Sequence, residues 1–536
     1  MSGNLNHLDI VIVIAYLLFI TGTGFHFARR VHSSSDYFLA GRNLGWLVIG
    51  ASIFAISISS EHMIGLAGSG AKNGFAIGQI EWLASFVLLI LVWTILPRYI
   101  STGIKTIPEF LGNRYNASLR SIISLFMIII MLSTRILLTL LVGGWLLNMT
   151  MGWNTFITMI ILLLITGLYT ITGGLRAIIK TEFLQSIFLI AGVLIVTLSG
   201  LNEIGGISKL HASFSDEFYC SFRSITDSNF PWTGIVLGVP IIAFWYWCTD
   251  QVTVQRLISA RNIDQARSGA ILSGFLNLLP LFLIVLPGLL AITLFPEISG
   301  YETFPTFVNS HLIPHGLKGI VVAGILAAIM SSLSSSLNSS ATLFSYDIYG
   351  RMKPHATDHE LLLVGRLATT IFVIIGILLL PLIHSTNIDF LVYLFKVQFI
   401  FSPPITAILL MGLISSKVNT RGAFVTFISG TVLAFMKFLL DLYPQTSHSG
   451  FKLYNWFVSL NYLHFIIILF LICSGILFGV SYYTGRSRQV RLAGDRDQFF
   501  TAGQMRIKDL ITGKDINLYA SLALVVLIVI IWTILI

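Results

Sequence analysis

Residues 51 to 70 read ASIFAISISSEHMIGLAGSG, an apolar run interrupted by small and polar residues. Glu61 and His62 stand in its middle, where a membrane-spanning helix would place them far from water. Ionisable residues inside a membrane span are costly and usually line a pathway. The Gly and Ser content predicts a broken helix, because unwound backbone at membrane depth is tolerated only inside protein or beside a cavity.

The rest of the chain has the composition of a membrane protein. Of its 536 residues 55% are hydrophobic and only 10% are charged, against about 25% charged in soluble domains. The long apolar runs exclude a β-barrel and predict an all-α polytopic membrane protein with about 14 transmembrane helices. The predicted spans are 8–27, 47–70, 76–97, 121–150, 153–171, 182–202, 232–254, 269–295, 317–349, 363–384, 386–412, 422–440, 461–482 and 516–536.

The charge distribution predicts the orientation of these spans. The net charge is +9, and most of the 32 Lys and Arg fall on one side if the N-terminus lies outside. The positive-inside rule then predicts an integral protein of the plasma (inner) membrane with the N-terminus and the C-terminus outside. Membrane lipid accounts for the basic loops, so no nucleic-acid partner is needed. The sequence has no phosphate-binding loop, which argues against an ATP-driven pump.

Two further stretches place polar residues inside apolar runs. One is FWYWCTDQVTVQR at 244–256, and the other is SSLSSSLNSS at 331–340. Serines can simply allow close helix packing, but serines at i and i+4 can also point several oxygens at one cation. Broken helices at corresponding positions of two halves indicate a secondary-transporter site. The predicted parts are a first helix and loop (1–46), five-helix blocks at 47–202 and 232–412, an outer loop (203–231) and additional helices (413–536).

Several motifs occur in the order found in one known family. DYFLAGRN at 36–43, IPEF at 107–110, YTITGGL at 169–175, the stretch at 244–256 and SSATLFSYDIY at 339–349 resemble the sodium:solute symporter family, most closely its sodium/glucose cotransporter branch. The resemblance runs from about residue 8 to 440. It implies a leucine-transporter-type 5+5 inverted repeat with additional helices, and sodium-coupled uptake of a solute.

The resemblance also implies where the sodium ion binds. Its ligands would be the backbone carbonyls of Ala55, Ile58 and Ala328 and the hydroxyls of Ser331 and Ser332. Hard cations prefer such all-oxygen shells. Some members hold a second sodium, for which the matching residues are Glu182, Ser334 and Ser335. The family's usual residue at 182 is aspartate, and the longer glutamate favours a single sodium.

The matching substrate positions are Ser57, His62, Glu81, Ala243, Tyr246, Trp247, Gln251, Asn277 and Phe395. The resemblance implies that Tyr246 stacks under a sugar and closes the inner gate, while His62 and Glu81 bind sugar hydroxyls. At 57, 243, 277 and 395 the family's polar residues are replaced, which removes hydroxyl partners and changes the preferred solute.

Three further residues have side chains whose roles can be predicted separately. We expect Trp245 to belong to an interfacial aromatic belt and Arg256 to mark the cytoplasmic boundary. Arg135, inside the fourth span, is expected either to pair with Glu61 or Glu81 or to have a purely structural role.

The predicted function is sodium-coupled import of a small organic solute, a sugar or a polyol, by a protein that is not an enzyme. The alternatives are symport of a carboxylate, amino acid or vitamin-like solute, proton coupling through Glu61 or His62, and a transporter-like sensor. No channel filter or catalytic arrangement is visible in the sequence. The sequence leaves the solute, the number of sodium ions and the oligomeric state open.

Overall fold

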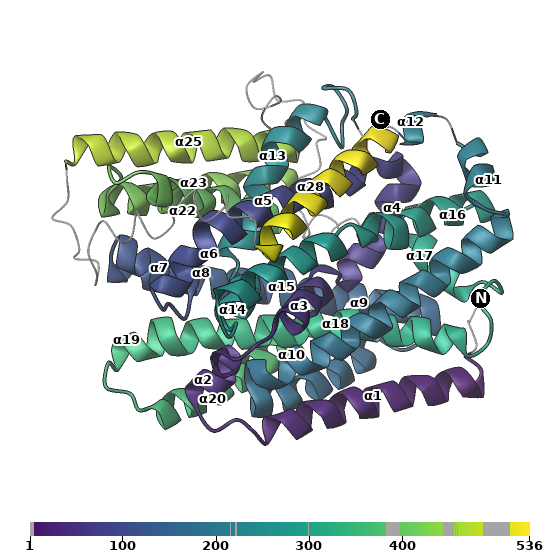
Figure 1. Cartoon of the computed structure of the whole chain (residues 1–536), viewed down its shortest axis with the longest axis horizontal. Coiled ribbons are helices and arrows are strands. Elements are labelled where there is room, and N and C mark those ends of the chain that lie inside the picture. The colour runs from purple at the N-terminus through teal and green to yellow at the C-terminus, as the bar shows by residue number, and fades with distance from the viewer. Residues whose placement is uncertain are drawn as a thin grey trace.

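A computed structural model of the chain describes residues 5–214, 216–219, 222–298, 300–381, 397–442, 455, 457, 459–485 and 515–535. Every regular element in these ranges is a helix (Figure 1). The first group is α1 His7–Ala28, α2 Ser34–Leu39, α3 Trp46–Ser57, α4 Ser60–Asn73, α5 Gly78–Ile90, α6 Leu96–Ser101, α7 Ile107–Arg114, α8 Ala117–Ile130, α9 Leu137–Met151, α10 Thr155–Ile204, α11 Ile207–Ala212 and α12 Asp216–Tyr219. The second is α13 Trp232–Phe244, α14 Gln251–Ile258, α15 Ile263–Leu276, α16 Leu286–Leu294, α17 Thr303–Asn309, α18 Leu317–Leu343, α19 Gly350–Met352, α20 Asp358–Leu379, α22 Ser402–Ile414, α23 Thr420–Leu442, α25 Tyr462–Tyr483 and α28 Ile516–Leu535.

Helices that could span a membrane dominate the fold. Within the described residues, 12 helical stretches are long and apolar enough to cross a bilayer. This confirms an all-α polytopic membrane protein, but it does not confirm the predicted number of 14. One of the 12 stretches, Thr155–Ile204, contains a sharp bend at Gly174.

The first predicted helix break is present. Helix α3 ends at Ser57, and Ile58 (φ −102°, ψ 96°) and Ser59 (φ −99°, ψ 175°) are extended before α4 begins. In a continuous helix the carbonyl of Ala55 would accept the amide of Ser59. The break removes that bond, and this carbonyl accepts a hydrogen bond from the Ser331 hydroxyl instead, at 3.0 Å.

The second predicted break lies within the stretch at 244–256. Helix α13 continues as a π-helical segment, Trp245–Thr249, and then stops at Asp250, whose backbone is extended (φ −67°, ψ 123°). Helix α14 begins at the next residue. Broken helices therefore open both predicted five-helix blocks, although the block boundaries at 47–202 and 232–412 stay predictions.

The bend in α10 joins two of the motifs noted in the sequence. Gly174 has φ 50° and ψ −152°, a conformation that glycine adopts far more readily than other residues. A Cβ atom there would lie 2.3 Å from the carbonyl oxygen of Tyr37 in α2. The Tyr37 hydroxyl in turn donates to the carbonyl of Thr170, at 3.3 Å. The motifs at 36–43 and 169–175 therefore meet at this bend.

Gly174→Ala should lower the free energy of unfolding by about 2 kcal/mol, because alanine is strained at positive φ and its methyl group meets the Tyr37 backbone. Thermal melting of the purified protein in detergent measures the effect. Gly22→Ala in α1 is the matched control, since a Cβ there meets nothing within 4 Å. Equal melting temperatures for the two variants would contradict this reading of the bend.

The serine-rich helix α18 lies in the middle of the bundle. Every residue from 321 to 343 is buried, and α18 packs most extensively against α10. Figure 1 shows α1 at one edge of the bundle and α22, α23 and α25 at the opposite edge. The buried Asp9 of α1 accepts the amides of Gly316 and Gly319 at 2.8 and 2.7 Å, which fixes the start of α18. The serines are therefore presented from a firmly packed core helix.

Candidate solute cavity and cation site

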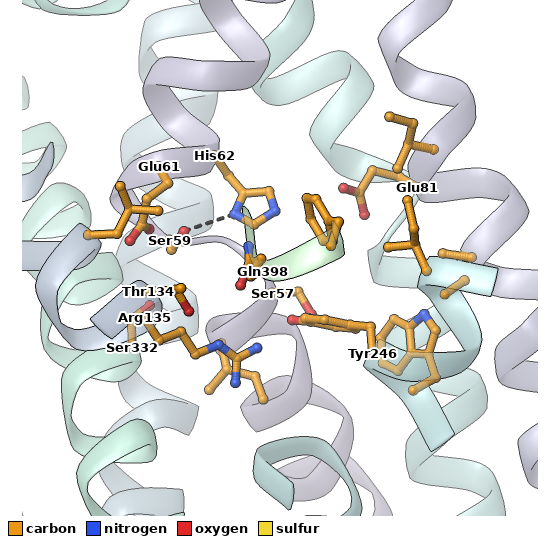
Figure 2. A pocket seen from close by; sticks show the side chains of 18 of the residues that line it. Ser57, Ser59, Glu61, His62, Glu81, Thr134, Arg135, Tyr246, Ser332 and Gln398 are labelled. Carbon is orange, nitrogen blue, oxygen red and sulfur yellow. Dashed lines mark hydrogen bonds between the residues drawn. The ribbon is translucent and has the colours of Figure 1, made fainter. Parts of the chain in front are cut away.

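A cavity lies between the two broken helices (Figure 2). Its walls come from the α3–α4 break, α5, the α8–α9 helix, α13 with the π-helical segment that follows it, α18 and the segment before α22. Six of the nine predicted substrate residues line it: Ser57, His62, Glu81, Ala243, Tyr246 and Trp247. The structure thus brings these six residues together from three separate parts of the chain.

Two other predicted substrate residues do not line the cavity. Gln251 is fully buried, accepts the amide of Ile107 at 3.0 Å and donates to the carbonyl of Lys105 at 3.3 Å. The extended backbone of Asp250 changes the chain direction just before it, so Gln251 holds the start of α7 rather than facing a solute. Asn277, at the end of α15, is also buried away from the cavity. Phe395 lies outside the described residues.

Hydrogen-bonding groups face one another across the cavity. In Figure 2, Glu81 points in from one wall, while His62 and Glu61 approach from the opposite wall. The His62 ring nitrogen Nδ1 lies 2.9 Å from the hydroxyl of Ser59, and Glu61 accepts a hydrogen bond from Thr139 at 2.7 Å. The Glu81 carboxylate accepts no side-chain hydrogen bond among the described residues. A carboxylate and an imidazole on facing walls can hold a solute with several hydroxyl groups.

Two further lining residues were not predicted from the sequence. Gln398 and Phe399 enter the cavity from the segment that precedes α22. The amide of Gln398 supplies both a donor and an acceptor beside the solute space. A lone glutamine inside the apolar run at 386–412 was the available signal, because a buried amide requires a partner.

Aromatic rings form the floor of the cavity. The rings of Tyr246 and Trp247 meet edge to face with their centroids 5.2 Å apart. The Tyr246 hydroxyl donates to Ser57 at 3.4 Å, a bond that links the two broken helices. Arg135 lies over the Tyr246 ring at 5.5 Å and pairs with Asp250 at 2.9 Å. The expected pairing of Arg135 with Glu61 or Glu81 is therefore wrong, because the second helix break brings Asp250 to it.

The predicted sodium ligands gather at the first helix break. The Ser331 hydroxyl lies 3.0 Å from the carbonyl oxygen of Ala55 and 3.1 Å from that of Ala328. Ile58 is the first extended residue of the break. The Ser332 hydroxyl is buried, borders the solute cavity and has no hydrogen-bond partner among the described residues. Buried polar groups normally have partners, so this oxygen fits a cation ligand.

Two of the three residues predicted to bind a second sodium, Glu182 and Ser335, contact the buried guanidinium of Arg256. The guanidinium of Arg256 binds Glu182 through two nitrogens, at 2.5 and 3.2 Å, and both side chains are fully buried. The hydroxyls of Ser52 and Ser335 also donate to Glu182. The sequence predicted that Arg256 marks the cytoplasmic boundary. This prediction is wrong, because its side chain is fully buried and paired with Glu182. The third candidate, Ser334, donates to the carbonyl of Ser331 at 3.1 Å.

A helical membrane protein in which two broken helices flank a polar cavity has the architecture of a secondary transporter. Residues 37–430 match the sodium:solute symporter family, and the chain belongs to that family. The chain is 34% identical to mouse sodium/glucose cotransporter 4 over 90% of its own length and 76% of that protein. It is 35% identical to bovine sodium/mannose cotransporter SLC5A10, over 90% and 88% of the two chains.

Solved structures agree on the fold. A Na⁺-coupled sialic acid symporter in a substrate-bound, outward-open state aligns with a TM-score of 0.79 at 20% identity, covering 91% of this chain and all of that one. Mhp1, a nucleobase-cation-symport-1 family transporter, aligns with a TM-score of 0.52 at 14% identity, over 87% and 99%. The chain accordingly has the leucine-transporter-type fold with additional helices.

Proposed function

We propose that the protein is a sodium-coupled symporter that imports a sugar by alternating access. The observation that carries this proposal is the position of Ser332, whose unpartnered hydroxyl lies between the cation site and the solute cavity. The relatives named sodium/glucose and sodium/mannose cotransporters support the same activity. The protein works as an integral protein of the plasma (inner) membrane with both termini outside, and it catalyses no chemical reaction.

The two sites are coupled through the first helix break. Sodium is held by Ala55 and Ile58 on the broken helix and by Ala328, Ser331 and Ser332 on α18. The same break places Ser57 and His62 in the solute cavity. A ligand shifts a conformational equilibrium only by its differential affinity for the two states. Sodium therefore favours the arrangement in which the solute-binding wall is complete.

The solute is a sugar or a polyol. Glu81, His62 and Gln398 supply charged and polar partners for hydroxyl groups, while the rings of Tyr246 and Trp247 cover an apolar face. Ser57 and Ala243 offer few polar atoms, which favours a less hydroxylated or differently shaped solute. The alternatives are a carboxylate or amino acid solute, proton coupling through Glu61 or His62, and a sensor role.

One sodium ion moves with each solute. A second ion would need the oxygens of Glu182, Ser334 and Ser335. Arg256 already supplies a positive charge to Glu182 and donates to Ser335 at 2.7 Å. A sodium ion at this place would have to compete with a guanidinium tethered to the chain.

Uptake into proteoliposomes tests the proposal. An inward sodium gradient should drive uptake of at least one member of a panel of labelled sugars and polyols, and replacing sodium by potassium should abolish it. A panel of amino acids and organic acids serves as the comparison. Uptake driven equally well by a proton gradient without sodium, or confined to the amino acids and organic acids, would overturn the proposal.

Ser332→Ala should weaken the activation of uptake by sodium about tenfold, because it removes one oxygen from the cation shell. The sodium concentration that gives half-maximal uptake measures the effect. Ser340→Ala, on the same helix, is the control, since among the described residues the Ser340 hydroxyl donates only to the sulfur of Met131, at 3.5 Å. Unchanged sodium dependence in a folded Ser332→Ala protein would place the cation site elsewhere.

A further inference from the structure

The solute cavity carries an excess of negative charge. Among its described lining residues, Glu61, Glu81 and Arg135 have charged side chains. His62 also lines it, but an imidazole is mostly uncharged at pH 7. The guanidinium of Arg135 is already offset by Asp250, at 2.9 Å. Two carboxylates therefore remain without a countercharge among the described residues, and one sodium ion would balance only one of them.

Glu61 presents a carboxylate oxygen that has no partner. The residue is only 8% exposed, and its Oε1 accepts a hydrogen bond from Thr139 at 2.7 Å. Its Oε2 is buried and has no hydrogen-bond partner among the described residues. Glu61 lies in the first turn of α4, where the helix dipole favours a negative charge. A buried ionised carboxylate is costly unless it is paired, so this oxygen suits a positively charged group.

The position of Glu61 assigns this positively charged group to the solute. The predicted sodium ligands meet where Ser331 of α18 contacts the carbonyl of Ala55 in α3. Glu61 instead belongs to α4, beyond the helix break, and lines the solute cavity. In Figure 2, Glu61 and Ser59 lie on one wall, and Glu81 points in from the opposite wall. A cationic group that pairs with Glu61 would therefore lie within the solute space.

The aromatic floor suits the remainder of such a solute. The rings of Tyr246 and Trp247 can attract a nearby cation as well as cover an apolar face. The indole nitrogen of Trp247 is buried without a partner among the described residues, so it can donate to a hydroxyl oxygen. The neighbouring Trp245 is only 8% exposed, so its expected place in an interfacial aromatic belt is wrong.

We propose that the transported sugar is an amino sugar whose ammonium group binds the Glu61 carboxylate, while its hydroxyl groups bind Glu81 and Trp247. This assignment rests on the proposed function and narrows the class of solute. An ammonium group has three donors and no acceptor, which complements an ionised carboxylate. Together with one sodium ion, it balances the two carboxylates of the cavity. A solute with a carboxylate would instead place a like charge beside them.

Matched pairs of sugars test the proposal on the wild-type protein. Sodium-driven uptake is compared at a pH of about 6.5, where an amine is protonated, for D-glucosamine with D-glucose, D-galactosamine with D-galactose and D-mannosamine with D-mannose. At least one amino sugar should have a kcat/KM about tenfold or more above that of its neutral partner. The N-acetyl derivative of that amino sugar, which is uncharged, should lose this advantage.

The possible failures of the two proposals are distinguishable in this experiment. Sodium-driven uptake of neutral sugars with no preference for any amino sugar would overturn the assignment of an amino sugar and leave the proposed function intact. Absence of sodium-driven uptake for every sugar, charged or neutral, would overturn the proposed function itself.

Variants of Glu61 test which group reads the charge. Glu61→Gln should lower the ratio of kcat/KM between the amino sugar and its neutral partner about tenfold, whereas Glu61→Asp should retain most of the preference. Glu81→Gln, on the opposite wall, is the matched control and should lower kcat/KM for both sugars alike. An unchanged ratio in Glu61→Gln, with or without a shift in the sodium concentration for half-maximal uptake, would overturn the proposal.

Ligand-induced stabilisation gives a measurement that needs no variant. In the presence of sodium, the amino sugar should raise the melting temperature of the purified wild-type protein more than its neutral partner does at the same concentration. Raising the pH to about 9 should remove the difference, because the amine loses its proton. Equal shifts for the two sugars at both pH values would contradict recognition of the ammonium group.

Discussion

Replacing Arg256 by leucine is expected to lower the free energy of unfolding by about 3–5 kcal/mol, because the Glu182 carboxylate would remain buried without its cation. Both side chains are fully buried, so water cannot compensate the charge. Thermal melting of the purified variant in detergent measures the loss.

The double variant Glu182→Leu/Arg256→Leu distinguishes two contributions to the free energy of unfolding. One is the destabilisation by an unpaired buried charge, and the other is the net stabilisation by the intact ion pair. Replacing both partners of a buried ion pair by apolar residues is often close to neutral. We therefore expect the double variant to melt closer to wild type than Arg256→Leu does. A double variant as unstable as the single one would show that shape and the serine contacts, rather than charge, hold this part of the core.

Glu81→Gln is expected to lower kcat/KM for sugar uptake about 10- to 150-fold. A hydrogen bond to a charged group contributes about 1.5–3 kcal/mol, and each 1.4 kcal/mol is a factor of ten. The amide keeps the size of the side chain but loses the charge that strengthens its bond to a solute hydroxyl. Initial rates of sodium-driven uptake over a range of sugar concentrations give the value.

Protein abundance and melting distinguish this role from a structural one. Arg135 is already paired with Asp250, so Glu81→Gln should leave the melting temperature unchanged. Glu203→Gln, at the exposed end of α10, is the control for loss of a carboxylate away from the cavity. A variant that melts early and transports at the wild-type rate per folded molecule would contradict substrate binding by Glu81.

The helix breaks could be predicted from the sequence because their cause is local. The stretch at 51–70 has small and polar residues around Ile58, and the stretch at 244–256 has polar residues around Asp250. Such residues are unfavourable in a continuous lipid-exposed helix. The motifs then predicted which side chains near the breaks face the solute. Ser57, His62, Ala243 and Tyr246 line the cavity, and each is within seven residues of a break.

The ion pairs could not be predicted because their partners are far apart in the chain. Arg256 and Glu182 meet across 74 residues, and Arg135 and Asp250 across 115. No local periodicity specifies such contacts, which depend on how the helices pack. Gln251 was misplaced for a related reason, since the extended backbone of Asp250 (φ −67°, ψ 123°) turns the next side chain away from the cavity.

The reversal potential of sugar-coupled current across proteoliposomes tests the central claim most directly. One sodium ion moving through 100 mV releases about 2.3 kcal/mol, and a tenfold sodium gradient adds about 1.4 kcal/mol. One ion per sugar can therefore support roughly several hundredfold accumulation, and two ions would roughly square that factor. The account predicts a reversal potential that fits one sodium per sugar. A ratio of two, or a reversal potential independent of sodium, would contradict it.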